Sequence, residues 1–519
     1  EELPAISVEE PEEGVWVFDL GQNMVGRARV NISGNEGDTV RIRHAEVTHP
    51  DGNIAPENLR SAKATDYYTF AHDGEATYEP RFTFHGFRYV EITGVDEAPT
   101  VEDVTGVVLH TDGELTSSLE TSDPMVNQLQ SNIVWGQRGN FLSIPTDTPA
   151  RDERLGWTGD INVFAPTATF NMDSASLLRK WMDDMRDAQL SNGAYPEVAP
   201  QFCTDPGIHP SCGGGSTGWA DAGITVPWEV WQRYGDTQII EENYDSMTAY
   251  IDFLQGEATN HIRSSYGSWG DWLNFDDPTP ANVLATAFYA HSVDLMADMA
   301  EAIGRNDDAE DYRLLFNNIR DAYIDAFISE DGTINGNSQT GYAISIEFGL
   351  VPEELVEVVG DRLDEAVADR DGHLATGFLG TPSLLPALSR AGHPETSYQL
   401  LLNRTYPSWG FQIDRGATTM WERWDSIKED GSFGDLAMNS FNHFAYGAVG
   451  DWMYRDVGGI SIAEPGHKKT LIAPKPGGGL THASATYESI HGAISSAWEL
   501  TDAGLQLDVT IPANTSARV

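Results

Sequence analysis

Residues 281–305, ANVLATAFYAHSVDLMADMAEAIGR, decide the fold class of this 519-residue chain. Apolar residues recur in this stretch at the three- and four-residue spacing of a single helix face. They are Val283, Leu284, Ala287, Phe288, Ala290, Val293, Leu295, Met296 and Met299. Gly304 ends the segment, and Asp307 begins a second apolar-periodic stretch over 307–329. The pattern therefore predicts two consecutive helices joined by a short turn.

The same period of hydrophobicity continues over residues 113–460 and predicts twelve helical segments. They lie near 122–143, 161–171, 173–190, 217–234, 238–258, 281–305, 307–329, 338–350, 352–368, 375–392, 393–405 and 436–458. Twelve helices in consecutive pairs fit a closed ring of six helical hairpins, and an open superhelix of repeats is the alternative. No repeat of fixed period is visible in the sequence, which favours the closed ring.

Both ends of the chain have the pattern of β-strands. Short β-branched and aromatic runs separated by Gly, Asn or Asp turns occupy residues 1–112, and similar runs return over 461–519. Strands at near-regular spacing predict antiparallel β-sandwiches. We therefore expect three domains, 1–112, 113–460 and 461–519, and expect part of the last to lie beyond residue 519.

The chain is strongly acidic, with 80 Asp and Glu against 31 Lys and Arg and a net charge of −49. This charge repels a phosphate backbone, so nucleic acid is excluded as a partner. No run approaches the roughly 20 apolar residues that a membrane helix needs, so we expect a soluble protein. The carboxylates are dispersed and only 6 residues are Lys. This composition favours a high-salt environment over an ordinary acidic surface, because salt screens self-repulsion.

Cysteine and histidine give no sign of a metal centre. Cys203 and Cys212 lie in one polar loop, where a disulfide and two free thiols are both compatible with the spacing. With His209 they make three ligands and lack a fourth, which disfavours zinc. His44, His49, His72, His85 and His110 lack ligand spacing and are interpreted as ordinary sandwich residues. EF-hand, P-loop and GxSxG patterns are absent, and we expect no metal or cofactor.

Two loops concentrate carboxylates, arginine and tryptophan. The first, PTDTPARDERLGWTGD over 145–160, is also compatible with a loop held by ion pairs, with Asp160 as the N-cap of the next helix. In the second, GATTMWERWD over 416–425, Glu422 lies beside Trp421 and Arg423. Either an Arg423–Glu422 structural pair or a carboxyl of raised pKa is compatible with this setting. Two carboxylates on separate loops among aromatic rings suit glycoside hydrolysis.

At these loops the sequence resembles a known family. DTPARDERLGWTGD, ATTMWERWDS and NSFNHFAYGAVGDWMYRDVGGI resemble motifs of the bacterial-type α-L-rhamnosidases, glycoside hydrolase family 78. DLGQNMVGRARV and FHGFRYVEI resemble the sandwich that precedes the catalytic domain in that family. The resemblance implies an (α/α)6 toroid flanked by β-sandwiches, and inverting hydrolysis of terminal α-L-rhamnosides such as flavonoid glycosides, oligosaccharides or polysaccharides.

The resemblance also implies roles for individual residues. Glu153 matches the general acid, and Glu422 matches the general base that activates water. Expected sugar contacts are Asp147, Asp152, Trp157, Asp160, Trp219, Trp272, Trp421 and His443. Arg151 lies inside the first motif with a less defined role. Inversion requires the two carboxyl groups to lie ~6.5–9.5 Å apart, whereas ~5 Å implies a retaining route.

Glu153 has to hold a proton near neutral pH to act as an acid. We expect burial against Trp157 and negative charge from Asp147 or Asp160 to favour this state. The alternatives are a toroid glycosidase or lyase for another sugar, and a non-catalytic carbohydrate-binding surface protein. The chain begins EELPAISVEE with no readable leader, which resembles the interior of a longer polypeptide. Of the compartments, the cytoplasm is favoured over secretion, and the sequence gives no oligomeric state.

The acidity predicts that stability depends on salt. We expect the chain to lose its fold at low salt, because the carboxylates then repel one another without screening. At 1 M salt the Debye length of about 3 Å shortens the range of this repulsion. Circular dichroism melting between about 0.1 and 3 M KCl tests this expectation. A melting midpoint that does not respond to salt over this range would contradict it.

Overall fold

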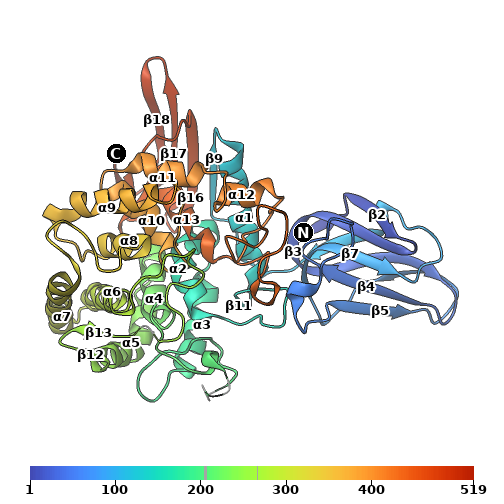
Figure 1. The fold of residues 1–519 in the computed structure, drawn as a ribbon, viewed down its shortest axis with the longest axis horizontal. Coiled ribbons are helices and arrows are strands. Elements are labelled where there is room, and N and C mark those ends of the chain that lie inside the picture. The colour runs from blue at the N-terminus through green and yellow to red at the C-terminus, as the bar shows by residue number, and fades with distance from the viewer. Residues whose placement is uncertain (204–206, 208, 266) are drawn as a thin grey trace. The chain divides into compact units, whose positions relative to one another are not determined.

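A computed structural model describes residues 1–203, 207, 209–265 and 267–519 (Figure 1). The chain divides into two compact units. The first, which we call the sheet unit, contains residues 1–112, 131–155 and 412–444. The second, the ring unit, contains residues 113–130, 156–411 and 445–519. The sheet unit therefore combines the N-terminal β segment with two stretches that come from the helical part of the sequence.

The sheet unit is built around an eight-stranded antiparallel sheet. Its strands are β1 (Glu2–Pro4), β2 (Ser7–Glu12), β3 (Val15–Gly34), β4 (Thr39–Ala45), β5 (Thr65–Thr69), β6 (Gly74–Tyr78), β7 (His85–Thr93) and β8 (Val104–Val108). The long strand β3 pairs with β2 and β7 in its first half and with β6 and β8 in its second. An irregularity between Asp19 and Met24 separates the two halves. This change of partners lets one strand serve both parts of the sheet around a shared apolar core.

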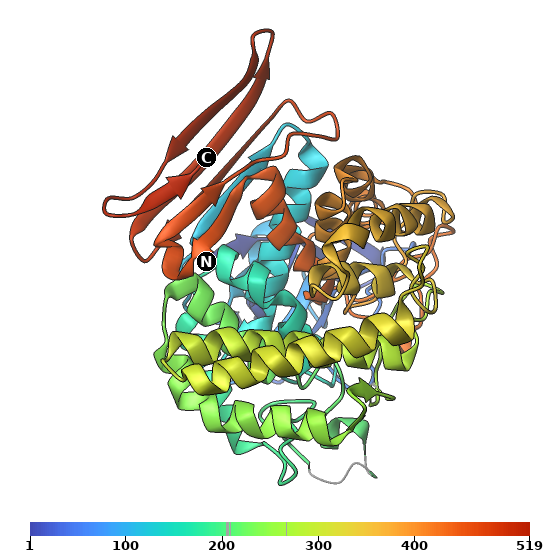
Figure 2. The ribbon, with the colours of Figure 1, turned by 90° about the vertical axis from the view of Figure 1, so that its left-hand side faces the viewer.

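The ring unit contains helices that alternate between buried and amphipathic. The buried helices are α2 (Thr158–Asn171), α4 (Ala222–Tyr234), α6 (Ala281–Ala302), α8 (Gln339–Glu347) and α10 (Thr381–Arg390). Between them in sequence come α3 (Ala175–Asp187), α5 (Gln238–Gly256), α7 (Asn306–Phe327), α9 (Val356–Ala368) and α11 (Pro394–Leu402), which bury one face only. The pair α6 and α7 lies side by side in Figure 2. A helix that is apolar on all sides suits an inner position in the ring, and a helix with one apolar face suits an outer position.

The inner helices form a closed circle. Each packs on the next in the order α2, α4, α6, α8, α10, α13 (Val449–Trp452), and α13 packs again on α2. The buried Thr167 hydroxyl of α2 donates to the Ala448 carbonyl at 3.0 Å and accepts the Asp451 N–H at 2.9 Å. The closed ring predicted from the sequence is confirmed, and an open superhelix is excluded by this contact.

The ring unit also carries two small sheets. Strand β9 (Ser117–Thr121) joins β16 (His482–Ser489), β17 (Gly492–Thr501) and β18 (Gly504–Thr510) in an antiparallel sheet (Figure 1). Strands β14 (Ile460–Glu464), β15 (Lys469–Ile472) and β19 (Ser516–Arg518) form the other, in which β15 and β19 run parallel. Apart from this one pairing, the strands of the terminal β segments run antiparallel. The sheet of β16, β17 and β18 also includes β9, which comes from a much earlier part of the chain.

The sequence prediction was wrong about one helix and omitted another. Residues 436–458 form short 3-10 and π turns around α13 in place of a long helix. The Ser440 hydroxyl donates to the Asn442 carbonyl and accepts the Asn442 N–H, and such local bonds compete with helical ones, while Asn439 donates to the Ser426 carbonyl outside the stretch. The short helix α12 (Trp409–Asp414) was not predicted. Helix α1 (Pro124–Asn140) lies within the predicted segment near 122–143.

Two further features are the state of the two cysteines and the apolar character of the helices. Cys203 and Cys212 form a disulfide, which settles the alternative that the sequence left open. His209, the third member of the weak zinc pattern, bonds through Nδ1 to the Ser211 hydroxyl at 2.7 Å. Among the described helices, none combines the length and the apolar character required to cross a membrane.

Thr167 offers a test of ring closure. Replacing Thr167 by Val keeps the shape of the side chain but leaves the Asp451 N–H and the Ala448 carbonyl without their buried partner. We expect a loss of about 1–3 kcal/mol in the free energy of unfolding, measured by urea denaturation. Thr167→Ser retains the hydroxyl and is the matched control. Equal stability of the Val and Ser variants would contradict the role assigned to this hydroxyl.

Candidate active site

The first carboxylate loop is held by its own backbone. Asp147 N–H donates to the Leu155 carbonyl at 2.9 Å, and Leu155 N–H donates to Asp147 Oδ1 at 2.9 Å. Asp147 is buried, at 2% exposure. These bonds close residues 147–155 into a loop whose intervening side chains, among them Arg151 and Glu153, are presented together. The buried Asp147 therefore serves as a structural anchor at one end of the loop.

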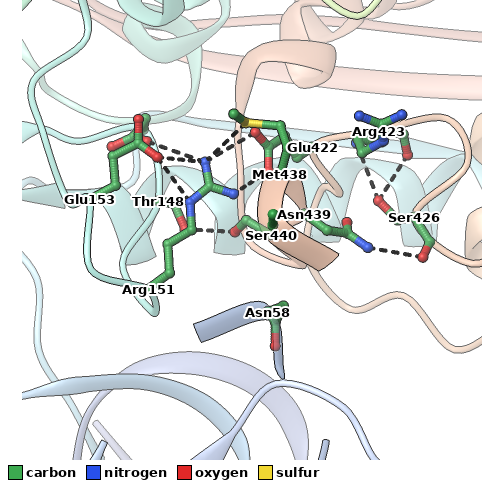
Figure 3. Close-up of polar contacts among 12 residues, drawn as sticks. Asn58, Thr148, Arg151, Glu153, Glu422, Arg423, Ser426, Met438, Asn439 and Ser440 are labelled. Atoms are coloured by element: carbon green, nitrogen blue, oxygen red, sulfur yellow. Dashed lines mark hydrogen bonds and ion pairs between the residues drawn. The ribbon is translucent and has the colours of Figure 1, made fainter. Parts of the chain in front are cut away.

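The second carboxylate is positioned by two extended segments that pair with each other. Glu422 N–H donates to the Ser440 carbonyl at 2.9 Å, and His443 N–H donates to the Met420 carbonyl at 2.8 Å. The Thr148 hydroxyl donates to the Ser440 hydroxyl at 2.7 Å, which ties the first loop to this pair. Ser440 thus links the segment of Glu422 to the loop of Glu153 through one hydroxyl contact (Figure 3).

One guanidinium group connects the two glutamates (Figure 3). Arg151 Nη1 and Nη2 donate to the two oxygens of Glu422 at 2.6 and 3.1 Å. On its other edge, Nε and Nη2 contact Glu153 Oε2 at 3.0 and 2.8 Å. Asp147 Oδ2 lies 3.8 Å from Nη2. The side chains of Arg151 and Glu422 are each 2% exposed, so this is a buried pairing of one cation with three carboxylates.

Burial and charge set the ionisation of this cluster. Burial opposes the ionised form of Glu422, but the Arg151 guanidinium outweighs it and holds the pKa of this carboxyl below its ordinary value. Burial lowers the pKa of His443 to about 4, although the Glu422 charge acts in the opposite direction. At neutral pH the structure therefore supports an ionised Glu422 beside a neutral imidazole. The raised pKa that was one interpretation of the sequence at Glu422 is wrong, because the partner is Arg151.

The pairing of Arg423 with Glu422, the other interpretation, is not the main contact either. Arg423 Nε donates to Asp425 Oδ1 at 2.7 Å, whereas Arg151 makes the two-pronged contact with Glu422. The two neighbouring residues Glu422 and Arg423 therefore have different partners.

Arg60 was not found by the sequence analysis. Arg60 Nη2 donates to Glu153 Oε2 at 2.8 Å, and Arg60 Nε donates to Asp152 Oδ1 at 2.7 Å. Asp152 also accepts from the backbone N–H and hydroxyl of Ser61. Arg60 lies in the segment NLRSAK, which carries no motif, and no local pattern could have identified it. The carboxyl group of Glu153 therefore contacts two guanidinium groups, those of Arg60 and Arg151.

Trp421 lies in a small hydrophobic cluster of the sheet unit. It is 3% exposed, packs with Ala417, and meets the Phe441 ring edge-on at 5.3 Å between centroids. These contacts are those of a core residue. Trp421 and its neighbour Glu422 thus have different surroundings, an apolar cluster and the Arg151 guanidinium.

In the ring unit, Trp157, Trp219 and Trp272, which were predicted as sugar contacts, surround Trp269, which the sequence analysis missed. Trp269 meets Trp157 and Trp272 edge-on, with centroids 5.1 and 5.6 Å apart, and Trp219 at 6.2 Å. Its indole N–H donates to Glu197 Oε2 at 3.0 Å. The signal for Trp269 was its position three residues before Trp272 in GSWGDWLNF.

The ring unit also contains two buried acids near these rings in sequence. Burial raises the pKa of Glu197 to about 7, with bonds from Ser216 and Trp269 acting against this rise. Glu197 was not predicted, since PEVAP carries no motif that the analysis used. Asp160 is buried in the first turn of α2, where a carboxylate interacts favourably with the helix dipole. It is the third residue of the helix, and Trp157 occupies the N-cap position that the alternative interpretation gave to Asp160.

The fold and the paired glutamates define a class, that of carbohydrate-active proteins built on a ring of helical hairpins. Comparison with known families is more specific. Residues 114–457 match the bacterial alpha-L-rhamnosidase 6 hairpin glycosidase domain, residues 9–110 the concanavalin-like domain and residues 459–519 the C-terminal domain of the same family. The chain belongs to the bacterial α-L-rhamnosidase family, glycoside hydrolase family 78.

Individual relatives agree with this assignment. An alpha-L-rhamnosidase of Streptomyces avermitilis is 52% identical over the whole chain, and one of Formosa agariphila is 42% identical over 97% of it. The crystal structure of the Streptomyces avermitilis enzyme complexed with L-rhamnose superposes with a TM-score of 0.96 over all of this chain and 49% of that one. The structure from Dictyoglumus thermophilum is 36% identical, with a TM-score of 0.93 over all of this chain and 58% of that one. The chain spans about half the length of the curated relatives it matches, 49% and 54% for these two.

Replacing Arg151 tests the electrostatics of the cluster. The lowered pKa of Glu422 means that its ion pair adds stability above the ordinary carboxyl pKa, and that this stability is lost as pH falls through the folded-state value. Arg151→Met leaves a buried charge unpaired, so we expect a loss of about 3–5 kcal/mol at pH 7 and a smaller loss at about pH 4.

Urea unfolding followed by tryptophan fluorescence measures this difference. Arg423→Met is the matched control, because its partner Asp425 is partly exposed and the expected loss is below about 1 kcal/mol. Arg151→Met would contradict the interpretation if it cost no more than the control at pH 7, or if its cost grew as the pH fell.

Proposed function

We propose that the chain hydrolyses terminal α-L-rhamnosides with inversion at the anomeric carbon. The observation that carries this proposal is the position of Glu153 and Glu422, which come from distant parts of the sequence and bind the same Arg151. Membership of the rhamnosidase family supports the sugar, and the relative from Streptomyces avermitilis has been crystallised with L-rhamnose. The substrate class we propose is a rhamnose-containing glycoside.

Each glutamate receives a separate role. Glu153 protonates the leaving glycosidic oxygen, and Glu422 takes a proton from the water that attacks the anomeric carbon from the opposite face. The ionised state favoured for Glu422 suits a base. Its buried position also strengthens its interaction with the positive charge that develops on the sugar ring in the transition state.

The distances within the cluster bear on stereochemistry. Since Glu153 Oε2 and Glu422 Oε1 both contact Arg151 Nη2, at 2.8 and 3.1 Å, these two oxygens are about 6 Å apart at most. Carboxyl groups lie ~5 Å apart in retaining glycosidases and ~6.5–9.5 Å apart in inverting ones. The proposal of inversion therefore rests on the resemblance of the motifs and is decided by the anomer of the first product.

The guanidinium contacts of Glu153 place a condition on its role. Two guanidinium groups contact its carboxyl group, whereas a general acid has to reach the glycosidic oxygen that it protonates. We propose that the bound glycoside displaces Arg60, whose side chain is 28% exposed, and leaves Glu153 with Arg151 alone. Arg151 is 2% exposed and bound to Glu422, which makes it the less mobile of the two partners.

The remaining predicted residues keep the sugar-contact roles that the resemblance implies. In the sheet unit, Asp147, Asp152 and His443 would meet hydroxyl groups. In the ring unit, Trp157, Trp219 and Trp272 keep the role of apolar walls that the resemblance implies. Trp421, with its core contacts, is the weakest of these assignments. We also retain two proposals from the sequence. One is a division into three domains at residues 112 and 460, and the other is a high-salt habitat.

Substitution of the glutamates tests the assignment of roles. We expect Glu153→Gln and Glu422→Gln each to lower kcat by ~10³ or more with an unchanged fold, because each removes one proton-transfer group. Hydrolysis of an alkyl α-L-rhamnoside, whose leaving group requires protonation, measures the effect in molar salt, and p-nitrophenyl α-L-rhamnoside beside other p-nitrophenyl glycosides measures the sugar preference of the parent chain. Glu429→Gln, an exposed residue near Glu422 in sequence, is the matched control. Near-normal turnover in either variant would remove that residue from the mechanism.

Leaving-group and product measurements separate the two roles. An activated leaving group requires little protonation, so activated aryl rhamnosides should restore much of the activity of Glu153→Gln and little of that of Glu422→Gln. The opposite pattern would exchange the roles. Proton NMR of the first product reports its anomer, and α-L-rhamnose as the initial product would refute inversion.

A further inference from the structure

Two histidines and an aspartate lie together on neighbouring strands of the sheet unit. They are His44 on β4, Asp66 on β5 and His85 on β7, and β4 pairs with both of the other strands. One ligand atom from each residue lies within 4.8 Å of the others. His85 Nε2 lies 3.2 Å from Asp66 Oδ2, and the rings of His44 and His85 stack with centroids 4.1 Å apart. The sequence analysis interpreted both histidines as ordinary sandwich residues, because they are 41 positions apart in the chain.

The buried ring of His44 has one nitrogen with a partner and one without. His44 Nδ1 lies 3.0 Å from the Ala64 carbonyl, and because a carbonyl only accepts, Nδ1 carries the hydrogen. Nε2 then bears a lone pair, and this atom is buried with no hydrogen-bond partner in the structure. The residue is 1% exposed. A buried acceptor without a donor costs free energy, so the arrangement calls for an explanation.

A metal ion provides that explanation. Imidazole ligands of metal ions characteristically donate their second N–H to a backbone carbonyl, which fixes the ring and leaves the other nitrogen for the metal. His44 has this arrangement. Burial and the neighbouring His85 also lower the pKa of His44 to about 3, so the ring is neutral, as a ligand must be.

The distances fit a tetrahedral ion. Two ligands that each lie ~2.0–2.1 Å from zinc are separated by about 3.3 Å at a tetrahedral angle. Asp66 Oδ2 and His85 Nε2 are 3.2 Å apart already, and a ring nitrogen of His44 lies within 4.8 Å of a ligand atom of each of these residues, so the His44 ring has to turn and approach to complete the site. The side chains of His85 and Asp66 are 11% and 12% exposed, which leaves a route for an ion and room for a water as fourth ligand.

We propose that His44, Asp66 and His85 bind a divalent transition-metal ion of the zinc type. Two neutral imidazoles and one carboxylate leave the occupied site with one net positive charge, which water and the strongly acidic chain can tolerate. The ion joins three adjacent strands and fastens β5, the last strand in the order of the sheet, to β4 and β7. Its role is structural and independent of the reaction proposed for Glu153 and Glu422.

Metal binding by the full-length chain tests the proposal directly. Tag-free protein is stripped with a chelator in molar KCl, dialysed and titrated with ZnCl2 in competition with a chromophoric chelator. We expect one zinc per chain and a higher melting temperature after zinc is added, because an ion that binds only the folded state stabilises it. Co²⁺ in place of zinc should give the visible absorption of a low-coordinate site.

Variants locate the ion. Asp66→Asn and His85→Gln keep side-chain size at partly exposed positions, and we expect each to weaken zinc binding about 100-fold or more and to abolish the gain in melting temperature. His72→Gln, an exposed histidine of the same segment, is the matched control and should bind zinc as the parent does. Circular dichroism without metal verifies that each variant is folded.

Two results would overturn the proposal. One is a parent chain that binds no stoichiometric zinc and gains no stability from it. The other is binding that Asp66→Asn and His85→Gln leave unchanged, which would assign the ion to another part of the chain. Loss of hydrolytic activity is not used as a measure, so failure of the proposed rhamnosidase function would not affect this outcome.

Discussion

The Arg151 guanidinium is the interaction on which the candidate site depends. It satisfies Glu422 through two bonds and Glu153 through two more, with Asp147 close behind. Three carboxylates within one water-poor cluster would repel one another strongly without a cation among them. Arginine is suited to this position because its planar group offers donors along more than one edge and stays protonated. The cluster therefore holds three carboxylates close together, and one side chain maintains its stability.

The sequence predicted the parts of this protein that depend on local patterns. Residues 281–305 form α6 because a helix has a fixed period, and the closed ring follows from many such segments in succession. The helix predicted over 436–458 was wrong for a local reason as well, since Ser440 bonds to the backbone of Asn442 and interrupts the helical pattern. Glu153 and Glu422 were found because they lie inside motifs that carry a resemblance to a family.

The parts that the sequence did not predict depend on contacts between distant segments. Arg60 reaches Glu153 from the N-terminal sheet, and no feature of its own neighbourhood marks it. The pairing of Glu422 with Arg151 reversed the expected sign of the pKa shift, because the decisive charge lies 271 positions away. His44, Asp66 and His85 came together through strand pairing, and ligand spacing along the chain gives no hint of it. A site formed by the pairing of strands can be recognised only in the three-dimensional structure. A site within a sequence motif can be recognised from the sequence.

The sheet unit has a consequence for biosynthesis. Its strands come from the first 112 residues, but the segment that bears Glu422 and His443 lies at 412–444, after most of the ring. During translation the N-terminal sheet leaves the ribosome long before that segment exists, so the nascent chain exposes the surface that later receives it. Contacts of such large sequence separation form slowly, because a long loop must close before they contribute. Completion of the site thus waits for the synthesis of residues 412–444, and termination before them would yield a chain that has Arg151 but lacks Glu422, its buried counter-charge.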